Sequence, residues 1–526
     1  MYYRVWQLPP GPFPYPLVGN LLEMDSRAPH KTLLKWSKRY GPIFTAWMAD
    51  PHVVLTSYDA IKEALIKHGD LFSGRPRNFT YDIYSKGNFG LAFSEGELWR
   101  EQRRLSLRIL KDLGFGRTLM QEKILAQSKR LVAAIVEQSQ PSTNIDLTPL
   151  IQLCIGNITC DVVFGRTFNT DREEFYKLAK LTNENERLFL TASSLLLNDQ
   201  PWMRFLPIFR DFSYQPLKRN VTELRKFMQV EIEKHLCAIE NRDTNADFLT
   251  AYLRLKTEGQ FRSFSDTQTI TVLTDLLAAG LESTVTTLRW AILYMIRHPE
   301  VQATAQKEIM NVLGSDGQVS LSDRTRMNYV SAVLAEVQRK ANVIAVNVQR
   351  KTMGETEIGR FKIPAGTTIL PQISAVMEDP FIFPQPQKFH PERFLTNGRF
   401  EFCDQLMPFG LGKRRCPGEP MAQMELFLVF VSLLQKFVFL PPKNMPVPLE
   451  TAIFVQMSPQ KLVVLLCLCQ WAANGSEQGT VIKRHVFMIF PSVERFKEAV
   501  RIERMRQLKE WIGGLQLKLL HKLLLA

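Results

Sequence analysis

The chain has 526 residues, of which 45% are hydrophobic and 22% are charged, an ordinary balance for a soluble globular protein. Its formal net charge of +14 favours an acidic partner or an anionic membrane surface. The basic residues are dispersed rather than clustered with aromatic residues, so we expect no nucleic-acid binding. The seven cysteines show neither zinc-site spacing nor an even disulfide framework, which favours a reducing compartment.

The N-terminal part predicts a stiff segment followed by a mixed helix and strand region. Prolines recur through residues 9–16, and such a run holds a chain extended. Residues 31–70 predict a helix, then strands, then another helix, with a turn at Gly41 and Pro42 before alternating strand-like residues. No stretch of about 18 or more apolar residues occurs in the sequence, so no membrane-spanning helix is predicted.

The next region combines a loop with a basic helix. Residues 79–93 contain glycines and aromatic residues, and we expect them to be irregular. Trp99 and Arg103 are four residues apart and therefore share one face of a helix. The same helix carries an exposed basic stripe, which is either a solvated face or a docking surface, at Arg100, Arg104, Arg108 and Lys111.

Residues 121–256 read as mostly helical, with one unusually apolar connection at residues 195–209. The tryptophan and arginine of this connection suit a membrane interface. A hydrophobic segment folded onto the core is the alternative.

A long apolar helix is predicted over residues 265–298, capped at its start by Ser265 and Asp266 and ending ahead of Pro299.

Polar and small residues form a stripe within this helix. Asp275, Ala279 and Glu282 share one face, flanked by Ser283. Such a stripe is costly in an apolar helix unless it is used. Ala279 and Gly280 leave a gap beside whatever the helix crosses.

Residues 409–418, with the sequence FGLGKRRCPG, place one cysteine just before a predicted apolar helix that starts near Glu419. Three cations precede Cys416 at residues 413–415. A helix N-terminus and nearby cations both favour thiolate over thiol. Cys416 is therefore predicted to be a nucleophile or a metal ligand rather than half of a disulfide.

The pattern F-x-x-G-x-R-x-C-x-G, at Phe409, Gly412, Arg414, Cys416 and Gly418, resembles the haem-binding loop of the cytochrome P450 monooxygenases. The resemblance covers about residues 8–466. It is closest to the microsomal drug- and fatty-acid-oxidising, family 2-like members, and residues 35–44 resemble invertebrate ones. It implies an α+β fold, mainly α with small β-sheets, in which a single large domain combines a helical core with a β-rich N-terminal lobe.

The resemblance also implies the limits of that domain. Residues 1–16 would be a short N-terminus and proline-rich hinge, and residues 17–467 the catalytic domain. In microsomal members such a hinge follows a transmembrane anchor, and we expect that the anchor is missing from this sequence. Residues 462–469 read as a final strand. Residues 468–526 would be an unrecognised extension, whose basic amphipathic pattern at residues 498–525 suits a membrane or partner helix or a mispredicted exon, which we favour.

The family's site residues carry over to matching positions. Haem b is implied, with the thiolate of Cys416 as ligand of the iron and further haem contacts from Trp99, Arg103, Ala279, Gly280, Arg350, Phe409, Arg414 and Gly418. Proton delivery falls to Glu282, Ser283 and Thr284, where Ser283 replaces the usual threonine. Substrate contacts fall to Phe79, Phe93, Asp275 and Val343. A buried ion triad that holds the haem-binding core falls to Glu336, Arg339 and Arg393.

The reaction implied is insertion of one oxygen atom from dioxygen into a small hydrophobic substrate, such as a xenobiotic, a fatty acid or a steroid-like molecule. Electrons would come from NADPH through a flavoprotein, NADPH–cytochrome P450 reductase, for which the basic stripe would be a docking surface, with cytochrome b5 as a second candidate partner. The expected location is the cytosolic face of the endoplasmic reticulum membrane. A peroxygenase or isomerase that needs no reductase is one alternative, and a non-catalytic haem-binding or sensor protein is another.

Overall fold

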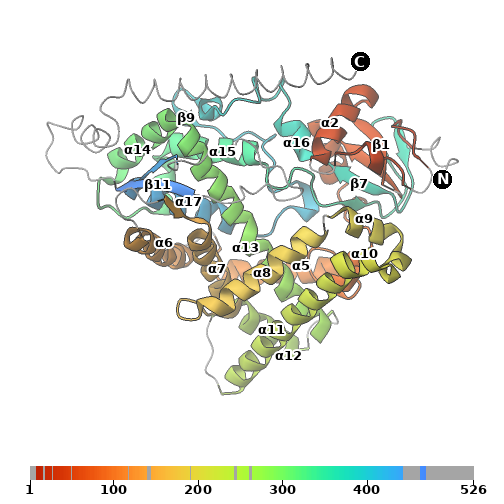
Figure 1. Cartoon of the computed structure of the whole chain (residues 1–526), viewed down its shortest axis with the longest axis horizontal. Coiled ribbons are helices and arrows are strands. Elements are labelled where there is room, and N and C mark those ends of the chain that lie inside the picture. The colour runs from red at the N-terminus through yellow and green to blue at the C-terminus, as the bar shows by residue number, and fades with distance from the viewer. Residues whose placement is uncertain are drawn as a thin grey trace, which may run out of the picture. The chain divides into compact units, whose positions relative to one another are not determined.

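The computed structural model describes residues 8–15, 18–25, 28–48, 50–115, 118–138, 144–189, 191–241, 246–259, 263–441 and 463–468. These residues form a mainly helical fold with small sheets, which confirms the predicted fold class (Figure 1). Residues 1–435 and 439–466 belong to one compact unit, and the site described below lies within this unit. The helix expected at residues 498–525 lies outside the described residues.

The N-terminal lobe is built on a four-stranded sheet with the order β1-β2-β7-β4. Strand β1 (Ile43–Met48) follows the turn predicted at Gly41 and Pro42, and it pairs antiparallel with β2 (Asp50–Leu55). Strand β7 (Thr368–Pro371) pairs parallel to β2, and β4 (Arg350–Lys351) pairs antiparallel to β7. Helix α2 (Pro29–Tyr40) covers this sheet with Leu33 and Trp36, and the lobe gathers around it (Figure 1).

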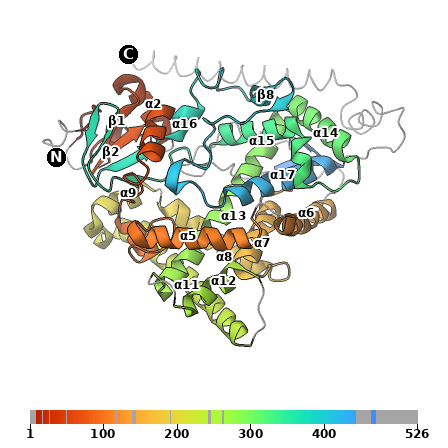
Figure 2. The same cartoon turned by 180° about the vertical axis from the view of Figure 1, so that it is seen from behind.

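The helical part surrounds α13 (Asp266–Arg297), which runs lengthwise among the other helices in both views (Figures 1 and 2). Its start is capped by the Ser265 side chain, which accepts a hydrogen bond from the Gln268 amide at 3.1 Å, as the sequence predicted. The helix packs most extensively against α7 (Thr148–Phe164) and also against α15 (Asn328–Ala341). Almost every residue from 268 to 296 is buried, so the few accessible residues show where other elements do not cover this helix.

The remaining helices have the following bounds: α3 Tyr58–Lys62, α5 Gly96–Asp112, α6 Thr118–Gln138, α8 Arg172–Phe189, α9 Ala192–Asp199, α10 Pro207–Phe209, α11 Gln215–Glu240, α12 Phe248–Thr257, α14 Pro299–Leu313, α16 Ile373–Met377 and α17 Glu419–Lys436. The remaining strands are β3 Asn144–Asp146, β5 Thr356–Ile358, β6 Phe361–Ile363, β8 Leu395–Thr396, β9 Arg399–Phe400, β10 Phe437–Leu440 and β11 Val463–Leu468. Strand β11 confirms the final strand predicted at residues 462–469 and pairs antiparallel with β3. Within the described ranges, no helix is both long and apolar enough to cross a bilayer.

The irregular conformation predicted for residues 79–93 is wrong in its first half. Residues Phe79–Ser85 form a helix, α4, which starts where the Asn78 side chain accepts a hydrogen bond from the Tyr81 amide at 3.1 Å. Asparagine is a favoured N-cap residue, which explains why a helix starts after Asn78. The helix ends at Lys86, whose φ of 58° lies in the left-handed region.

Candidate active site

The cysteine loop is closed by its own backbone. The Cys416 amide donates to the Phe409 carbonyl at 3.0 Å, and a short 3-10 helix, η7 (Gly412–Arg414), lies inside this turn. Gly412 has a φ of 72°, and a Cβ atom there would lie 1.9 Å from the Leu65 carbonyl oxygen, so only glycine fits. The loop thereby holds Cys416 three residues before the start of α17.

Protein atoms surround most of the Cys416 thiol. Its side chain is accessible to solvent, yet burial raises the pKa of the thiol above its ordinary value. The amides of Gly418 and Glu419 and the charge of Arg103 lower this pKa, as expected at a helix N-terminus, but burial outweighs them. The predicted net shift toward thiolate is therefore wrong for the protein alone. A metal bound to the sulfur would release the proton.

Four arginines lie close together, one of them beside Cys416, and we call Arg75, Arg103, Arg350 and Arg414 the arginine cluster. Burial and the charges of the other three arginines hold the pKa of Arg350 well below its usual range. Burial, Arg75 and Arg103 together lower the pKa of Arg414 to about 7, although Glu95 raises it. Glu95 is itself paired with a lysine at 2.6 Å. So many partly uncompensated cations suit a ligand that carries carboxylates.

Trp99 adds a flat wall and an unused donor to this site. The Arg414 guanidinium lies 3.6 Å from the centre of the Trp99 ring, and that of Arg103 lies 5.8 Å from it. Trp99 is buried, and its Nε1 has no hydrogen-bond partner among the described residues. A buried donor without a partner is rare unless a ligand completes it. The donor, the arginine cluster and the recessed thiol fit a haem with two propionates.

Helix α13 turns an accessible stripe toward the interior. Ala279 is exposed, and Leu276, Ala278, Gly280 and Ser283 are partly accessible, although most other residues of this part of the helix are buried. The Ser283 hydroxyl donates to the Ala279 carbonyl at 2.9 Å. This stripe differs from the predicted one. Asp275 and Glu282, which were predicted to lie on it, are buried on the neighbouring face of the helix.

The three residues predicted to deliver protons do not share one face. Glu282 accepts from Gln152 of α7 at 3.3 Å, and burial raises the pKa of its carboxyl. Thr284 points to another neighbour, since its hydroxyl donates to Glu425 of α17 at 3.0 Å. Each residue advances a helix by about 100°. That rotation leaves only Ser283 on the accessible stripe, so the structure does not support the role expected for Thr284.

Gly280 allows α13 to pack closely against α7, and it does not leave the gap that the sequence suggested. A Cβ atom at Gly280 would lie 2.6 Å from the Thr159 side chain of α7. The missing side chain therefore lets α13 and α7 approach closely, and Ala279 is more accessible than Gly280.

The predicted substrate contacts separate into different places. Phe93 is half-buried and stacks on Tyr81 with ring centres 4.0 Å apart. Phe79 instead stacks on Tyr214, 5.9 Å away. Asp275 accepts hydrogen bonds from two backbone amides of the loop at residues 91 and 92, at 2.7 and 2.9 Å, so it anchors that loop. Val343 is half-buried in the segment between α15 and β4.

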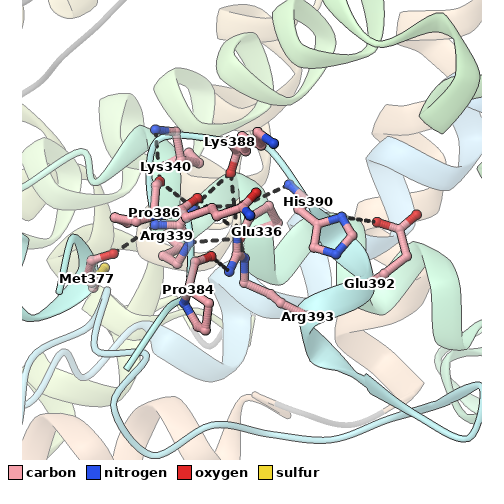
Figure 3. Close-up of polar contacts among 11 residues, drawn as sticks. Glu336, Arg339, Lys340, Met377, Pro384, Pro386, Lys388, His390, Glu392 and Arg393 are labelled. Carbon is pink, nitrogen blue, oxygen red and sulfur yellow. Dashed lines mark hydrogen bonds and ion pairs between the residues drawn. The ribbon is translucent and has the colours of Figure 1, made fainter. Parts of the chain in front are cut away.

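The predicted ion triad is confirmed (Figure 3). Glu336 and Arg339 of α15 are fully buried, and the carboxylate accepts from Arg339 at 2.7 and 2.8 Å. Arg393 approaches the same carboxylate at 3.1 Å, and the His390 amide donates to it at 2.9 Å. Arg339 also donates to the Met377 carbonyl at 2.7 Å. The triad ties α15 to the segments that precede the cysteine loop.

Sequence reasoning missed two site residues. Arg75 donates to backbone carbonyls at residues 92, 348 and 349, which completes the arginine cluster. Glu186 of α8 has a carboxyl whose pKa is raised to about 8 by burial and by the charge of Glu282. Arg75 lies in a loop without periodicity, and Glu186 lies in a helix rich in charged residues, so neither stands out by pattern.

Comparisons with known proteins agree with this geometry. The family model Cytochrome P450 matches residues 9–465. Cytochrome P450 2C3 of Oryctolagus cuniculus is 36% identical over 462 residues, which are 86% of this chain and 93% of the relative. Cytochrome P450 2J2 of Homo sapiens is 37% identical over 457 residues, 86% and 89% of the two chains. Cytochrome P450 2M1 of Oncorhynchus mykiss is 37% identical over 438 residues, 82% and 86% of the two chains.

Proposed function

The chain belongs to the cytochrome P450 family and is similar to its family 2 members. We propose its reaction and its partners on this basis. As a member of the family, it is a haem-thiolate monooxygenase. We propose that it inserts one oxygen atom from dioxygen into a small hydrophobic organic substrate, with electrons from NADPH delivered by a flavoprotein reductase. The recessed Cys416 thiol beside the arginine cluster is the observation that carries this proposal.

The residues of the site would hold haem b between the cysteine loop and α13. The sulfur of Cys416 would ligate the iron, and Trp99 Nε1 with Arg103, Arg350 and Arg414 would bind the propionates. When bound, the haem supplies the iron at which dioxygen is activated. Burial of the carboxylates makes each hydrogen bond from a guanidinium stronger than in water.

Proton delivery would fall to two neighbouring residues of α13. Ser283 Oγ holds a proton at the wall of the interior, with its orientation set by the Ala279 carbonyl. Glu282 lies on the adjacent face, and because burial raises its pKa it retains a proton at higher pH than an exposed glutamic acid. Rotation of the Ser283 hydroxyl away from the Ala279 carbonyl would turn its proton toward the interior.

An apolar surface supports association with a membrane. Trp202, Phe205, Leu206, Ile208 and Phe212 are all exposed, and Phe205 and Phe212 are each more than 70% accessible. Isolated exposed apolar residues are ordinary, but five within eleven positions suit a lipid interface. We assign this surface to the cytosolic face of the endoplasmic reticulum membrane, as expected from the apolar connection at residues 195–209.

The basic stripe of α5 supports docking of an acidic reductase, with cytochrome b5 as a second candidate. Arg104, Arg108 and Lys111 are exposed, whereas Arg100 and Lys413 share Asp70 as an ion-pair partner. Changing Arg104 and Arg108 to glutamate should raise the KM for reductase about tenfold at low salt. The effect should shrink at high salt, and a change independent of salt would contradict docking at this stripe.

The test of the function is the absorption spectrum of the reduced protein with carbon monoxide, compared with Cys416→Ala and with Cys237→Ser as the control. Cys237 is exposed on α11, so its replacement should change nothing. A strongly red-shifted Soret band that is lost only in Cys416→Ala, together with NADPH-dependent product formation with added reductase, would support the proposal. A band typical of histidine ligation, or one that survives in Cys416→Ala, would contradict it.

A further inference from the structure

A hollow of about 380 Å³ lies at the surface beside the ion triad. It is lined by Pro384, Gln385, Lys388, His390 and Arg393. None of these five residues is acidic, and three of them have cationic or protonatable side chains. A hollow of this size accepts a charged group together with part of the small molecule that carries it.

The loop that borders the hollow turns its carbonyl groups toward the triad (Figure 3). Arg393 donates to the Pro384 carbonyl at 2.8 Å and to the Lys388 carbonyl at 3.3 Å. Arg339 donates to the Pro386 carbonyl at 2.9 Å. The negative ends of these peptide groups are therefore used inside the protein rather than at the hollow.

The same geometry leaves an amide donor available at the hollow. In a trans peptide the N–H group points opposite to the carbonyl oxygen, so the Gln385 amide points away from the arginine that the Pro384 carbonyl binds. Within the described ranges, this amide has no hydrogen-bond partner. Gln385 has a φ of 52°, which holds the turn in this orientation.

Positive charge exceeds negative charge around this loop. One carboxylate, that of Glu336, is shared by Arg339 at 2.7 Å and Arg393 at 3.1 Å. Lys340 donates only to a neutral carbonyl at 3.3 Å. Burial and the charges of both arginines lower the pKa of Lys340, although two acids raise it. Among the described carboxylates, none forms an ion pair with Lys388, so its exposed ammonium group is available to a ligand.

His390 offers a further donor at the rim. Its Nδ1 lies 3.0 Å from the Glu392 carboxylate, and its side chain is 56% exposed. Figure 3 shows the ring held on that side by Glu392. The second ring nitrogen makes no hydrogen bond to a described residue, so a protonated ring can bind an anion there while Glu392 keeps it oriented.

We propose that this hollow binds the dianionic phosphate group of a phosphomonoester through Lys388, His390 and the Gln385 amide. A phosphate group carries up to two negative charges and three acceptor oxygens, which match two cationic side chains and one amide. Arg393, whose side chain is 7% exposed, forms the wall and adds positive potential. The bound anion would offset the excess charge of the triad. This site is separate from the thiol and goes beyond the proposed monooxygenase function.

The test measures binding of two probes to the haem-loaded full chain. Glycerol 3-phosphate, titrated by calorimetry, represents a free phosphomonoester. Vesicles of phosphatidylcholine with phosphatidic acid, compared with phosphatidylcholine alone by sedimentation, represent a lipid headgroup. Lys388→Gln removes one cation of the site. Lys362→Gln is the matched control, because Lys362 is exposed on β6 and does not line the hollow.

We expect Lys388→Gln to weaken binding of glycerol 3-phosphate about tenfold and Lys362→Gln to leave it unchanged. Glycerol 3-phosphate should also raise the urea midpoint of the wild type, and this rise should shrink in Lys388→Gln, because a ligand of the folded state stabilises it. Binding only to vesicles with phosphatidic acid, again weakened by Lys388→Gln alone, would support the proposal and identify a lipid as the source.

Three results would overturn the proposal. The first is that neither probe binds saturably to the wild type. The second is binding that Lys388→Gln leaves unchanged. The third is an equal loss in Lys362→Gln, which would show attraction to the net positive charge of the chain instead of binding in the hollow.

Discussion

Replacement of Glu336 by glutamine tests how strongly the ion triad holds the fold together. Both Glu336 and Arg339 have no exposed side-chain surface. The carboxylate receives four contacts, two from Arg339 at 2.7 and 2.8 Å, one from Arg393 at 3.1 Å and one from the His390 amide at 2.9 Å. A glutamine keeps one acceptor but turns an NH₂ group toward the guanidinium groups that pointed at the other oxygen, which leaves buried cations uncompensated.

The cost can be derived from these contacts. Loss of one partner from a buried pair destabilises a protein by about 3–5 kcal/mol, a large share of the typical total of about 5–15 kcal/mol. With a urea dependence of about 3 kcal/mol per molar, the unfolding midpoint should fall by about 1–1.7 M. Tryptophan fluorescence of the haem-loaded protein in urea measures this midpoint.

The control is Glu392→Gln, in the short 3-10 helix η6 (Pro391–Phe394) and next to Arg393 of the triad. Glu392 is 45% exposed and contacts His390 at 3.0 Å and the Tyr329 hydroxyl at 2.9 Å. Such an exposed pair contributes less than about 1 kcal/mol, so its midpoint should move little. A Glu336→Gln midpoint close to that of the wild type, or a Glu392→Gln shift of equal size, would refute the reasoning.

Three further changes probe the helices around the site. Burial raises the pKa of Glu425 from an ordinary 4.5 to about 8. The free energy of unfolding of the wild type should therefore be highest below pH 4.5, as far as this group is concerned, and should decline as the pH rises to about 8. Glu425→Gln should gain stability relative to the wild type across that window, by a few kcal/mol in urea titrations at each pH. Gly280→Ala should cost about 1–3 kcal/mol, because the new Cβ meets Thr159 at 2.6 Å, and Thr159→Ala should rescue it; a missing rescue in thermal unfolding would contradict the close crossing. Trp99→Phe should speed transfer of haem to apomyoglobin about tenfold through loss of one donor, whereas Trp36→Phe, buried in the N-terminal lobe, should leave that rate unchanged.

The sequence alone predicted those features that depend on neighbours in the chain. The cap at Ser265, the turn at Gly41 and the glycines of the cysteine loop act over a few residues, so their residue types determine the local conformation. The family resemblance added the triad, in which Glu336 and Arg393 lie far apart in the sequence. The resemblance also named Arg103, Arg350 and Arg414, and the structure brings these three together with Arg75 in the arginine cluster.

Tertiary structure decided the features that depend on what packs against each side chain. A helical stripe shows which residues share a face, but the neighbours of that face determine that Ser283 faces the interior while Thr284 meets Glu425. The pKa of Cys416 is likewise raised, because burial by distant segments outweighs the nearby helix start that the sequence shows. Glu186 is an ordinary acid in a charged helix until folding buries it near Glu282 of α13, and burial and that charge raise the pKa of its carboxyl. Burial and charge are sums over neighbours in space, and only the folded chain specifies those neighbours.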